Sequence, residues 1–249
     1  MIYPFLLTAL AGLATLLGTI PIFVKINDKN KLISAACAFA SGVMITISII
    51  DLIPEAINYF KNSYNGFITI IITFITIVFG IVISQLLDKM IDTIGTGNNL
   101  FKVGILSMIV IILHNIPEGI VTFIISNKNI TLGLSICIAI ALHNIPEGIS
   151  IAIPIYYSTN NRFKAILYTF ISAISELLGA ILTYLFINNH INSLTLGVIL
   201  SFTAGIMIQI SINKLLPTSY EYNNKTTKIS FIIGIIFMII SLLLNNLIS

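Results

Sequence analysis

The sequence predicts an all-α, polytopic membrane protein with eight transmembrane helices in a single domain that covers residues 1–249. Hydrophobic residues make up 57% of the chain and charged residues only 8%, against about 25% charged residues in a soluble globular protein. A chain with so few charged side chains can expose its exterior only to lipid. Eight segments are also long enough to span a membrane, which takes about 20 apolar residues each.

The eight segments follow one another with short connections. They cover residues 2–24, 32–58, 66–87, 103–125, 130–156, 164–187, 194–215 and 229–248. The first segment lacks a basic start and is too long for a signal peptide, so we interpret it as a spanning helix. The longest connections are expected near 88–102 and 216–228.

The distribution of basic residues predicts the orientation. Ten of the twelve lie in the odd-numbered connections, and only Lys61 and Lys128 lie in the even-numbered ones. Basic residues concentrate on the cytoplasmic side of membranes, so both termini are predicted to be extracytoplasmic, with the protein in the cell (inner or cytoplasmic) membrane. The net charge of +3 is small and dispersed, which argues against a nucleic-acid partner.

Four other polar residues are expected to have structural roles or none. Cys37 and Cys137 lie in apolar segments and are expected to pack as small side chains rather than form a disulfide or a metal pair. Gln209 is expected to bond to a neighbouring helix. His190 falls in an outer connection, where no specific role is expected.

One heptapeptide occurs twice, in the fourth and fifth segments. His-Asn-Ile-Pro-Glu-Gly-Ile occupies residues 114–120 and again residues 143–149. In each copy His and Glu are four residues apart and therefore share one face of a helix. Each proline deprives the carbonyl four residues earlier of its helical partner, and a kink is expected there. Ionisable groups inside a membrane are rare and mark ion or substrate pathways.

The two heptapeptides place carboxylates deep in the membrane. At about 1.5 Å per residue, His114, His143, Glu176 and Met44 all reach the middle of the bilayer from four different helices. Glu118, one helical turn from His114, lies close to the same depth.

Three carboxylates, those of Glu118, Glu147 and Glu176, are therefore expected to be buried, and no basic residue at that depth can pair with them. They must therefore be protonated or neutralised by a cation. Imidazole, carboxamide and carboxylate ligands suit Zn, Fe(II), Mn or Co better than Mg, Ca or Cu(I).

Several roles stay open at this point. Asn115 and Asn144 are either metal ligands or interhelical hydrogen-bonding groups. Met44 is either a ligand or part of the apolar core. Asp51 and Glu55, toward the outer end of the second helix, form either a cation-attracting entrance or an interfacial cap.

A second internal repeat relates the second and seventh segments. Residues 42–54 align without gaps on residues 205–217, with eight of thirteen positions identical. The charge distribution makes the second helix run outward and the seventh run inward. Related sequences in opposite orientations are typical of inverted-repeat transporters, so helices 1–3 and 6–8 are predicted to form an inverted repeat around helices 4–5.

At these residues the sequence resembles the ZIP (Zrt-, Irt-like) family of divalent metal transporters, and its compact prokaryotic zinc-uptake branch in particular. The doubled His-Asn-x-Pro-Glu-Gly is the most specific feature, and residues 51–56 and 172–179 resemble the family motifs of helices 2 and 6. Three features depart from the family pattern: Ala173 and Leu177 replace Gly and Pro, Lys214 replaces an acidic residue, and the connection between helices 3 and 4 contains no His.

The resemblance implies a binuclear metal site. The first metal would be held by Met44, His114, Glu118 and Glu147. The second would add Asn115, Asn144 and Glu176, with Glu118 and Glu147 bridging. His143 occupies a position that is polar in the family but less regularly a ligand. The resemblance also implies that helices 1, 4, 5 and 6 move as a unit against helices 2, 3, 7 and 8, as in an elevator.

The predicted function is uptake of a divalent metal into the cytoplasm, with zinc as the first choice and iron, manganese or cobalt as alternatives. The metal is substrate and ligand; no cofactor and no enzymatic activity are expected, and a homodimer is left open. The main alternative is a selective metal channel. A proton-coupled carrier of another solute lacks a buried Arg or Lys for an anion, and an intramembrane metallopeptidase would need His-Glu-x-x-His on one helix.

Overall fold

The computed structural model describes residues 2–93, 98–187 and 192–248. Within these ranges it contains helices and no strand, and eight helical runs are long and apolar enough to cross a membrane. They are Ile2–Phe23, Lys29–Lys61, Gly66–Ile91, Asn99–Lys128, Ile130–Thr159, Arg162–Phe186, Ser193–Tyr222 and Asn224–Leu244. The predicted all-α class and the number of spans are confirmed.

Four of the runs change their helical winding along their length, which the sequence did not indicate. The first consists of α1 (Ile2–Leu13) and the 3₁₀-helix η1 (Ala14–Phe23). The second, sixth and seventh each contain a π-helical turn. The elements are α2 (Lys29–Ile47), η2 (Ser48–Leu52), α3 (Ile53–Lys61), α4 (Gly66–Thr93), α5 (Asn99–Lys128), α6 (Ile130–Thr159), α7 (Arg162–Leu182), η3 (Thr183–Ile187), α8 (Ser193–Ile210), η4 (Ser211–Leu215), α9 (Leu216–Tyr222) and α10 (Asn224–Ile248).

Asparagine caps explain why the connections are short. The side chain of Asn129 accepts hydrogen bonds from the amides of Thr131 and Leu132, so α6 begins one residue after α5 ends. Asn223 likewise caps α10 directly after α9. The predicted long connection at 216–228 is therefore wrong, because caps rather than polarity decide where a helix stops. The connection predicted at 88–102 is also too long, since α4 continues to Thr93.

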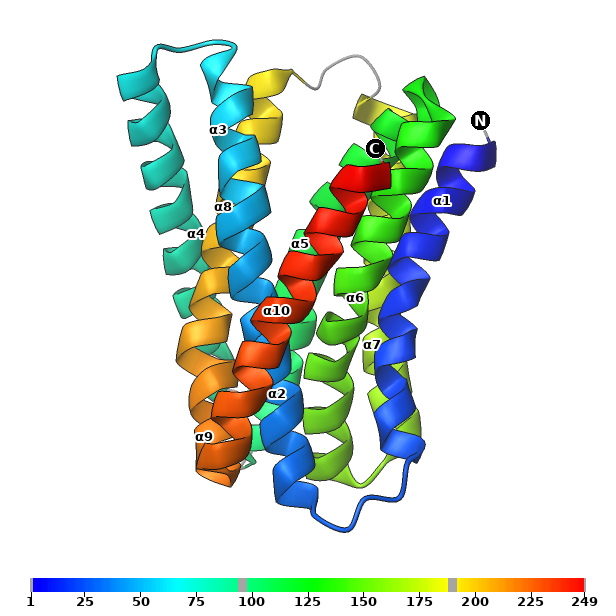
Figure 1. Cartoon of the computed structure of the whole chain (residues 1–249), viewed down its shortest axis with the longest axis vertical. Helices are drawn as coiled ribbons and strands as arrows, with labels where there is room; N and C mark the ends of the chain where they lie inside the picture. The colour runs from blue at the N-terminus through cyan, green and yellow to red at the C-terminus, as the bar shows by residue number, and fades with distance from the viewer. Residues whose placement is uncertain (1, 94–97, 188–191, 249) are drawn as a thin grey trace.

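The inverted repeat is visible in the directions and the windings of α2 and α8. The run from α2 to α3 ascends in Figure 1, whereas the run from α8 to α9 descends. The alignment of residues 42–54 on 205–217 superposes η2 on η4, so both copies contain a π-helical turn at the same place. Gly42 lies against the backbone of α10 and the equivalent Gly205 lies against that of α4. The two helices thus pack on equivalent neighbours in opposite orientations.

The first and sixth spans are also related by the inverted repeat. Asn144 on α6 donates to the Ala11 carbonyl of α1, and Asn115 on α5 donates to the Ser172 carbonyl of α7. Asn115 and Asn144 are equivalent in the two heptapeptides, and Ala11 and Ser172 are 161 residues apart. Gly18 and Gly179 are separated by the same interval and lie against α6 and α5, respectively.

Glycine contacts divide the helices into two bundles. The first bundle contains α1, η1, α5, α6, α7 and η3, and the second contains α2, α3, α4, α8, α9 and α10 with their π-helical turns. Among the described glycines, each one that has a close neighbour meets a helix of its own bundle. The most extensive helix pairs, α2 with α10 and α5 with α7, are also within bundles. Small residues allow close backbone approach inside a membrane, so each bundle is tightly joined internally.

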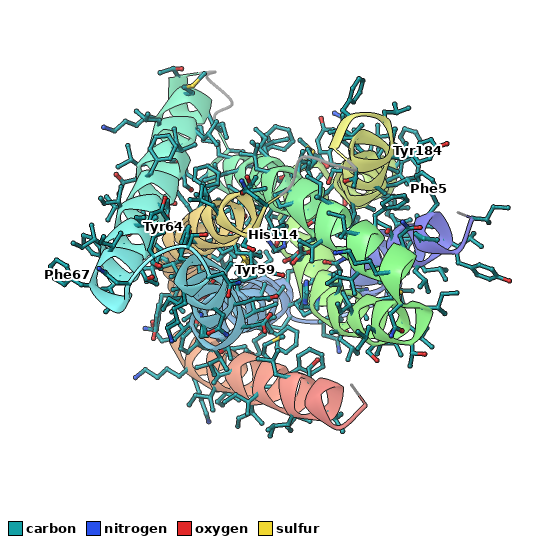
Figure 2. The ribbon with its side chains drawn as sticks, turned by 90° about the horizontal axis from the view of Figure 1, so that it is seen from above. Phe5, Tyr59, Tyr64, Phe67, His114 and Tyr184 are labelled. Carbon is teal, nitrogen blue, oxygen red and sulfur yellow. The ribbon has the colours of Figure 1, made fainter. Side chains whose placement is uncertain are left out.

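The exterior is apolar and the centre is polar. Seen from above, Phe67 on α4 points away from the bundle and His114 lies near its middle, while Phe5 of α1 and Tyr184 of η3 lie side by side (Figure 2). α1 begins and α10 ends at the same end of the bundle (Figure 1). We call this the outer end, following the orientation predicted from the charges.

The other structural expectations are also met. Cys37 and Cys137 are buried and unpaired. Gln209 accepts a hydrogen bond from the Ser84 hydroxyl of α4 at 2.8 Å. His190 lies outside the described residues.

Replacing Gly205 by Ala should destabilise the protein by about 1–3 kcal/mol. The added methyl carbon would lie 2.1 Å from the Ile77 carbonyl oxygen, so α8 would have to move away from α4. Thermal unfolding of the purified protein in detergent measures the effect. Gly66→Ala is the control, because nothing lies within 4 Å of its added carbon. Equal melting temperatures for the two variants would contradict the packing argument.

Candidate metal centre

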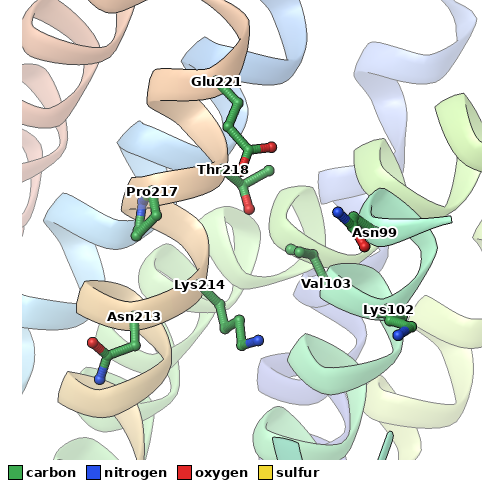
Figure 3. Close-up of a pocket in the computed structure, with 8 residues that line it drawn as sticks. All are labelled: Asn99, Lys102, Val103, Asn213, Lys214, Pro217, Thr218 and Glu221. Carbon is green, nitrogen blue, oxygen red and sulfur yellow. The ribbon is translucent and has the colours of Figure 1, made fainter. Parts of the chain in front are cut away.

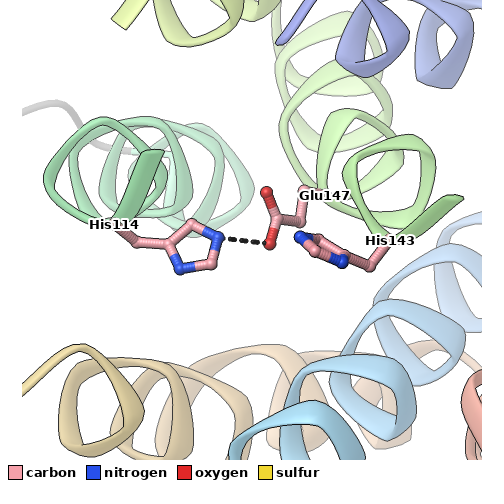
Figure 4. A group of neighbouring side chains, drawn as sticks. All are labelled: His114, His143 and Glu147. Carbon is pink, nitrogen blue, oxygen red and sulfur yellow. Dashed lines mark ion pairs between the residues drawn. The ribbon is translucent and has the colours of Figure 1, made fainter. Parts of the chain in front are cut away.

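The two heptapeptides face each other across the α5–α6 contact. Gly104 on α5 lies against Ile155 on α6, which brings the helices close together. His114 and Glu118 share one face of α5, and His143 and Glu147 share one face of α6. All four side chains are buried, with at most 7% of each residue exposed. Figure 4 shows His114 reaching from α5 toward Glu147, with the His143 ring on the other side of that carboxylate.

Each histidine reaches the glutamate of the other helix. His114 Nε2 lies 2.8 Å from Glu147 Oε1, and His143 Nε2 lies 3.2 Å from Glu118 Oε1. His114 Nε2 also lies 3.6 Å from Glu118 Oε2, within its own helix. The four side chains therefore form one closed group, which we call the crossed cluster.

The crossed cluster contains ligand atoms without hydrogen-bond partners. Both nitrogens of His114 and both carboxylate oxygens of Glu147 are buried without a hydrogen bond, because the close pair they form is not aligned for one. Ligand atoms of His114, His143 and Glu147 lie within 4.8 Å of one another. His143 Nε2, by contrast, is hydrogen-bonded to Glu118 Oε2 at 3.4 Å. Two converging imidazoles and two carboxylates match the N and O donors that zinc and related metals take.

Asn144 and Glu176 form a second polar group beside α1. Asn144 Nδ2 donates to Glu176 Oε2 and to the Ala11 carbonyl, each at 2.9 Å. Asn144 Oδ1 and Glu176 Oε1 are buried without partners. One oxygen of each side chain is therefore available to a cation.

The asparagines make the interhelical hydrogen bonds that were one of their two expected roles, and a ligand role for their oxygens stays a prediction. Asn115 Nδ2 donates to the Ser172 carbonyl at 3.4 Å, while Asn115 Oδ1 has no hydrogen-bond partner. In Asn144 the amide nitrogen likewise donates hydrogen bonds, and the amide oxygen has no partner. The nitrogen of each side chain joins two helices, and the oxygen stays available as a ligand atom.

Met44 lies on α2, in the other bundle. It is 1% exposed and belongs to the main apolar cluster, and its carbonyl accepts from the Ser48 hydroxyl. The burial agrees with its interpretation as a core residue. A ligand role for its sulfur stays a prediction.

Asp51 and Glu55 line a cavity together with two members of the crossed cluster. This cavity of about 240 Å³, which we call the outer cavity, is bordered by Asp51 of η2, Glu55 of α3, Glu118 and His143. The remaining lining is mostly apolar. The two acidic residues thus share one cavity with Glu118 and His143, and their role as a cation-attracting entrance stays a prediction.

The backbone groups of the site were not predicted from the sequence. The carbonyls of Ala11 and Ser172 accept hydrogen bonds from the two asparagines, and side-chain motifs do not reveal which backbone carbonyls a neighbouring helix will meet. The 161-residue interval between helices 1 and 6 was the available signal, but their side chains differ too much for it to stand out. Thr15, for example, occupies the position equivalent to Glu176, and its hydroxyl bonds to the Gly12 carbonyl of its own helix.

Comparisons with known proteins agree with this architecture. A family model described as ZIP Zinc transporter matches residues 96–242. Zinc transporter ZupT of Clostridium perfringens is 37% identical, over 96% of this chain and 95% of its own length. The same-named proteins of Streptococcus mutans and Chlorobaculum parvum are 35% and 34% identical, over at least 96% of each chain. On the strength of the family model and these nearly full-length relatives, the chain belongs to the ZIP zinc transporter family, and it is a multi-pass transport protein rather than an enzyme.

Proposed function

We propose that this protein carries divalent metal ions, zinc first among them, across the cell membrane into the cytoplasm through a binuclear site at the middle of the bilayer. The crossed cluster is the observation that supports this most directly. Buried carboxylates that contact no Lys or Arg need a compensating charge. A metal ion held between two imidazoles and two carboxylates supplies that charge, and the nitrogens of His114 and the carboxylate oxygens of Glu147 have no hydrogen bond that it would have to displace.

We place the first ion in the crossed cluster, held by His114, Glu118, His143 and Glu147, with Met44 of α2 as a further candidate ligand. The separation of the cluster atoms fits one tetrahedral ion after small side-chain adjustments, since Zn–N and Zn–O distances are about 2.0–2.2 Å. Mixed N and O ligands can release the metal again, because protons compete for them. Iron, manganese and cobalt share the same ligand preferences and are the alternative cargoes.

The second ion would bind between the crossed cluster and α7. Its ligands would be Asn115 Oδ1, Asn144 Oδ1 and Glu176 Oε1, with Glu118 and Glu147 as bridging carboxylates. The three oxygens named first are buried and unpartnered, which supports this assignment. The position equivalent to Glu176 in helix 1 is Thr15, so the inverted repeat offers a third carboxylate on one side only.

Entry from the outer end is supported by the outer cavity. Asp51 and Glu55 border it close to Glu118 and His143, so a cation can pass from acidic groups to imidazole and carboxylate ligands. The excess of basic residues at the opposite end supports the orientation in which both termini are extracytoplasmic.

The division into two bundles favours an elevator-like carrier over a channel. The crossed cluster, both asparagines and Glu176 belong to the bundle of α1, α5, α6 and α7. The absence of interlocking glycine contacts between the bundles, among the described glycines, leaves that interface free to slide. A channel would instead keep one open route, and saturation of flux in liposomes distinguishes the two.

Replacing His114 or Glu147 by Ala should reduce zinc uptake by cells to background, because either change removes a ligand of the crossed cluster. Radioactive zinc accumulation, normalised to the amount of protein in the membrane, measures the loss. Phe74→Ala, on the exposed face of α4, controls for expression and insertion. Normal uptake by both cluster variants would end the proposal.

Replacing Glu176 by Gln should lower the zinc stoichiometry of the purified protein from two ions to one, because the change removes the carboxylate that serves only the second ion. Calorimetric titration in detergent measures stoichiometry, and His114→Ala, which affects the first ion, is the comparison. A variant that still binds two ions would refute the assignment of Glu176.

Replacing both Asp51 by Asn and Glu55 by Gln should raise the KM for zinc about threefold to tenfold at low ionic strength, because the acidic entrance concentrates cations. The maximal rate should stay unchanged, and the difference should shrink at high salt. Uptake kinetics at two salt concentrations provide the test, and Asp28→Asn, at an exposed position at the inner end, controls for the loss of an acidic side chain far from the outer cavity. An unaltered KM would mean that the two acids are only an interfacial cap.

A further inference from the structure

A second polar cavity lies at the inner end of the molecule. This inner cavity, of about 260 Å³, lies between η4 and α9 on one side and the start of α5 on the other. Its polar lining includes Lys102, Lys214, Thr218 and Glu221. Figure 3 shows the Lys214 side chain extending across it from η4 toward Val103 of α5.

The inverted repeat relates the inner cavity to the outer one. The alignment of residues 42–54 on 205–217 makes Asp51 equivalent to Lys214, and the same interval of 163 residues makes Glu55 equivalent to Thr218. Both pairs line their respective cavities. The two cavities are therefore equivalent places in the two repeats, with the acidic residues of one replaced by a lysine and a threonine in the other.

The replacement reverses the charge. The outer cavity is lined by three carboxylates and no Lys or Arg, whereas the inner cavity is lined by two lysines and one carboxylate, that of Glu221. Lys214 Nζ lies 2.6 Å from Asp88 Oδ1 of α4, and both side chains are about one quarter exposed. The Lys214 ammonium is thus paired with the Asp88 carboxylate, which would otherwise be available to a metal ion at this end.

We propose that Lys214 is a tethered cation that weakens metal binding in the inner cavity. Its ammonium pairs with Asp88 and opposes the approach of divalent ions, so that metal reaching the inner cavity is held weakly and leaves readily for the cytoplasm. This inference rests on the proposed function, because it assumes that metal leaves through the inner end.

The expected effect follows from electrostatics. A single and a double positive charge about 8 Å apart in water repel each other enough to change occupancy about fivefold. The effect should shrink at high salt, where the Debye length falls to about 3 Å at 1 M.

The test measures the KM for zinc of forward and reverse flux in right-side-out and inverted membrane vesicles. Lys214→Gln should lower the KM of reverse flux about fivefold at low salt, because removing one positive charge strengthens zinc binding at the inner end. Lys89→Gln is the matched control, since it removes the same charge from an exposed position on α4 at the same end. Lys214→Arg keeps the charge and should retain the KM of the unmodified protein.

Asp88→Asn separates the electrostatic role of Lys214 from a structural one. It breaks the same ion pair but leaves the ammonium in place, so it should not lower the KM of reverse flux. An unchanged KM for Lys214→Gln, or an equal fall for Asp88→Asn, would overturn the inference and leave the proposed function intact. Absence of zinc flux in the unmodified protein would instead defeat the proposed function and this inference with it.

Discussion

The structure depends on one electrostatic constraint, which is that carboxylates inside a membrane-spanning bundle need a compensating positive charge. Glu118, Glu147 and Glu176 are all buried, and the groups that reach them are imidazoles and an amide rather than Lys or Arg. Every other feature of the site follows from satisfying this need. The histidines cross between helices to reach the carboxylates, and the asparagines bond to backbone with their nitrogens while keeping their oxygens free.

The inverted repeat supplies the framework that makes this arrangement possible. Two copies of one heptapeptide can face each other only because their helices have neighbours related by the same inversion. Asn115 of α5 and Asn144 of α6 make equivalent bonds, to the Ser172 carbonyl of α7 and the Ala11 carbonyl of α1, respectively. The symmetry is broken at two places: Glu176 on one side is matched by Thr15 on the other, and Asp51 at one end is matched by Lys214 at the other.

Glycine packing is compatible with the elevator-like movement that we propose. In a membrane, helices associate through close backbone contacts rather than through hydrophobic burial. These contacts hold each bundle together internally, and among the described glycines none joins one bundle to the other. The proposed metal ligands, apart from Met44 on α2, lie in one bundle, so a movement of that bundle as a unit would preserve their mutual distances.

The sequence alone determined the fold class, the eight spans, the inversion and the identity of the buried polar residues, because composition and repeated motifs record them directly. It erred at the connections around 216–228, since helix caps at single asparagines outweigh local polarity. The tertiary structure decided what depends on distances between helices: the crossing of His114 to Glu147 and of His143 to Glu118, the carbonyl partners of the asparagines, and the pairing of Lys214 with Asp88. Spacing along one helix fixes which side chains share its face, but only packing fixes what that face meets.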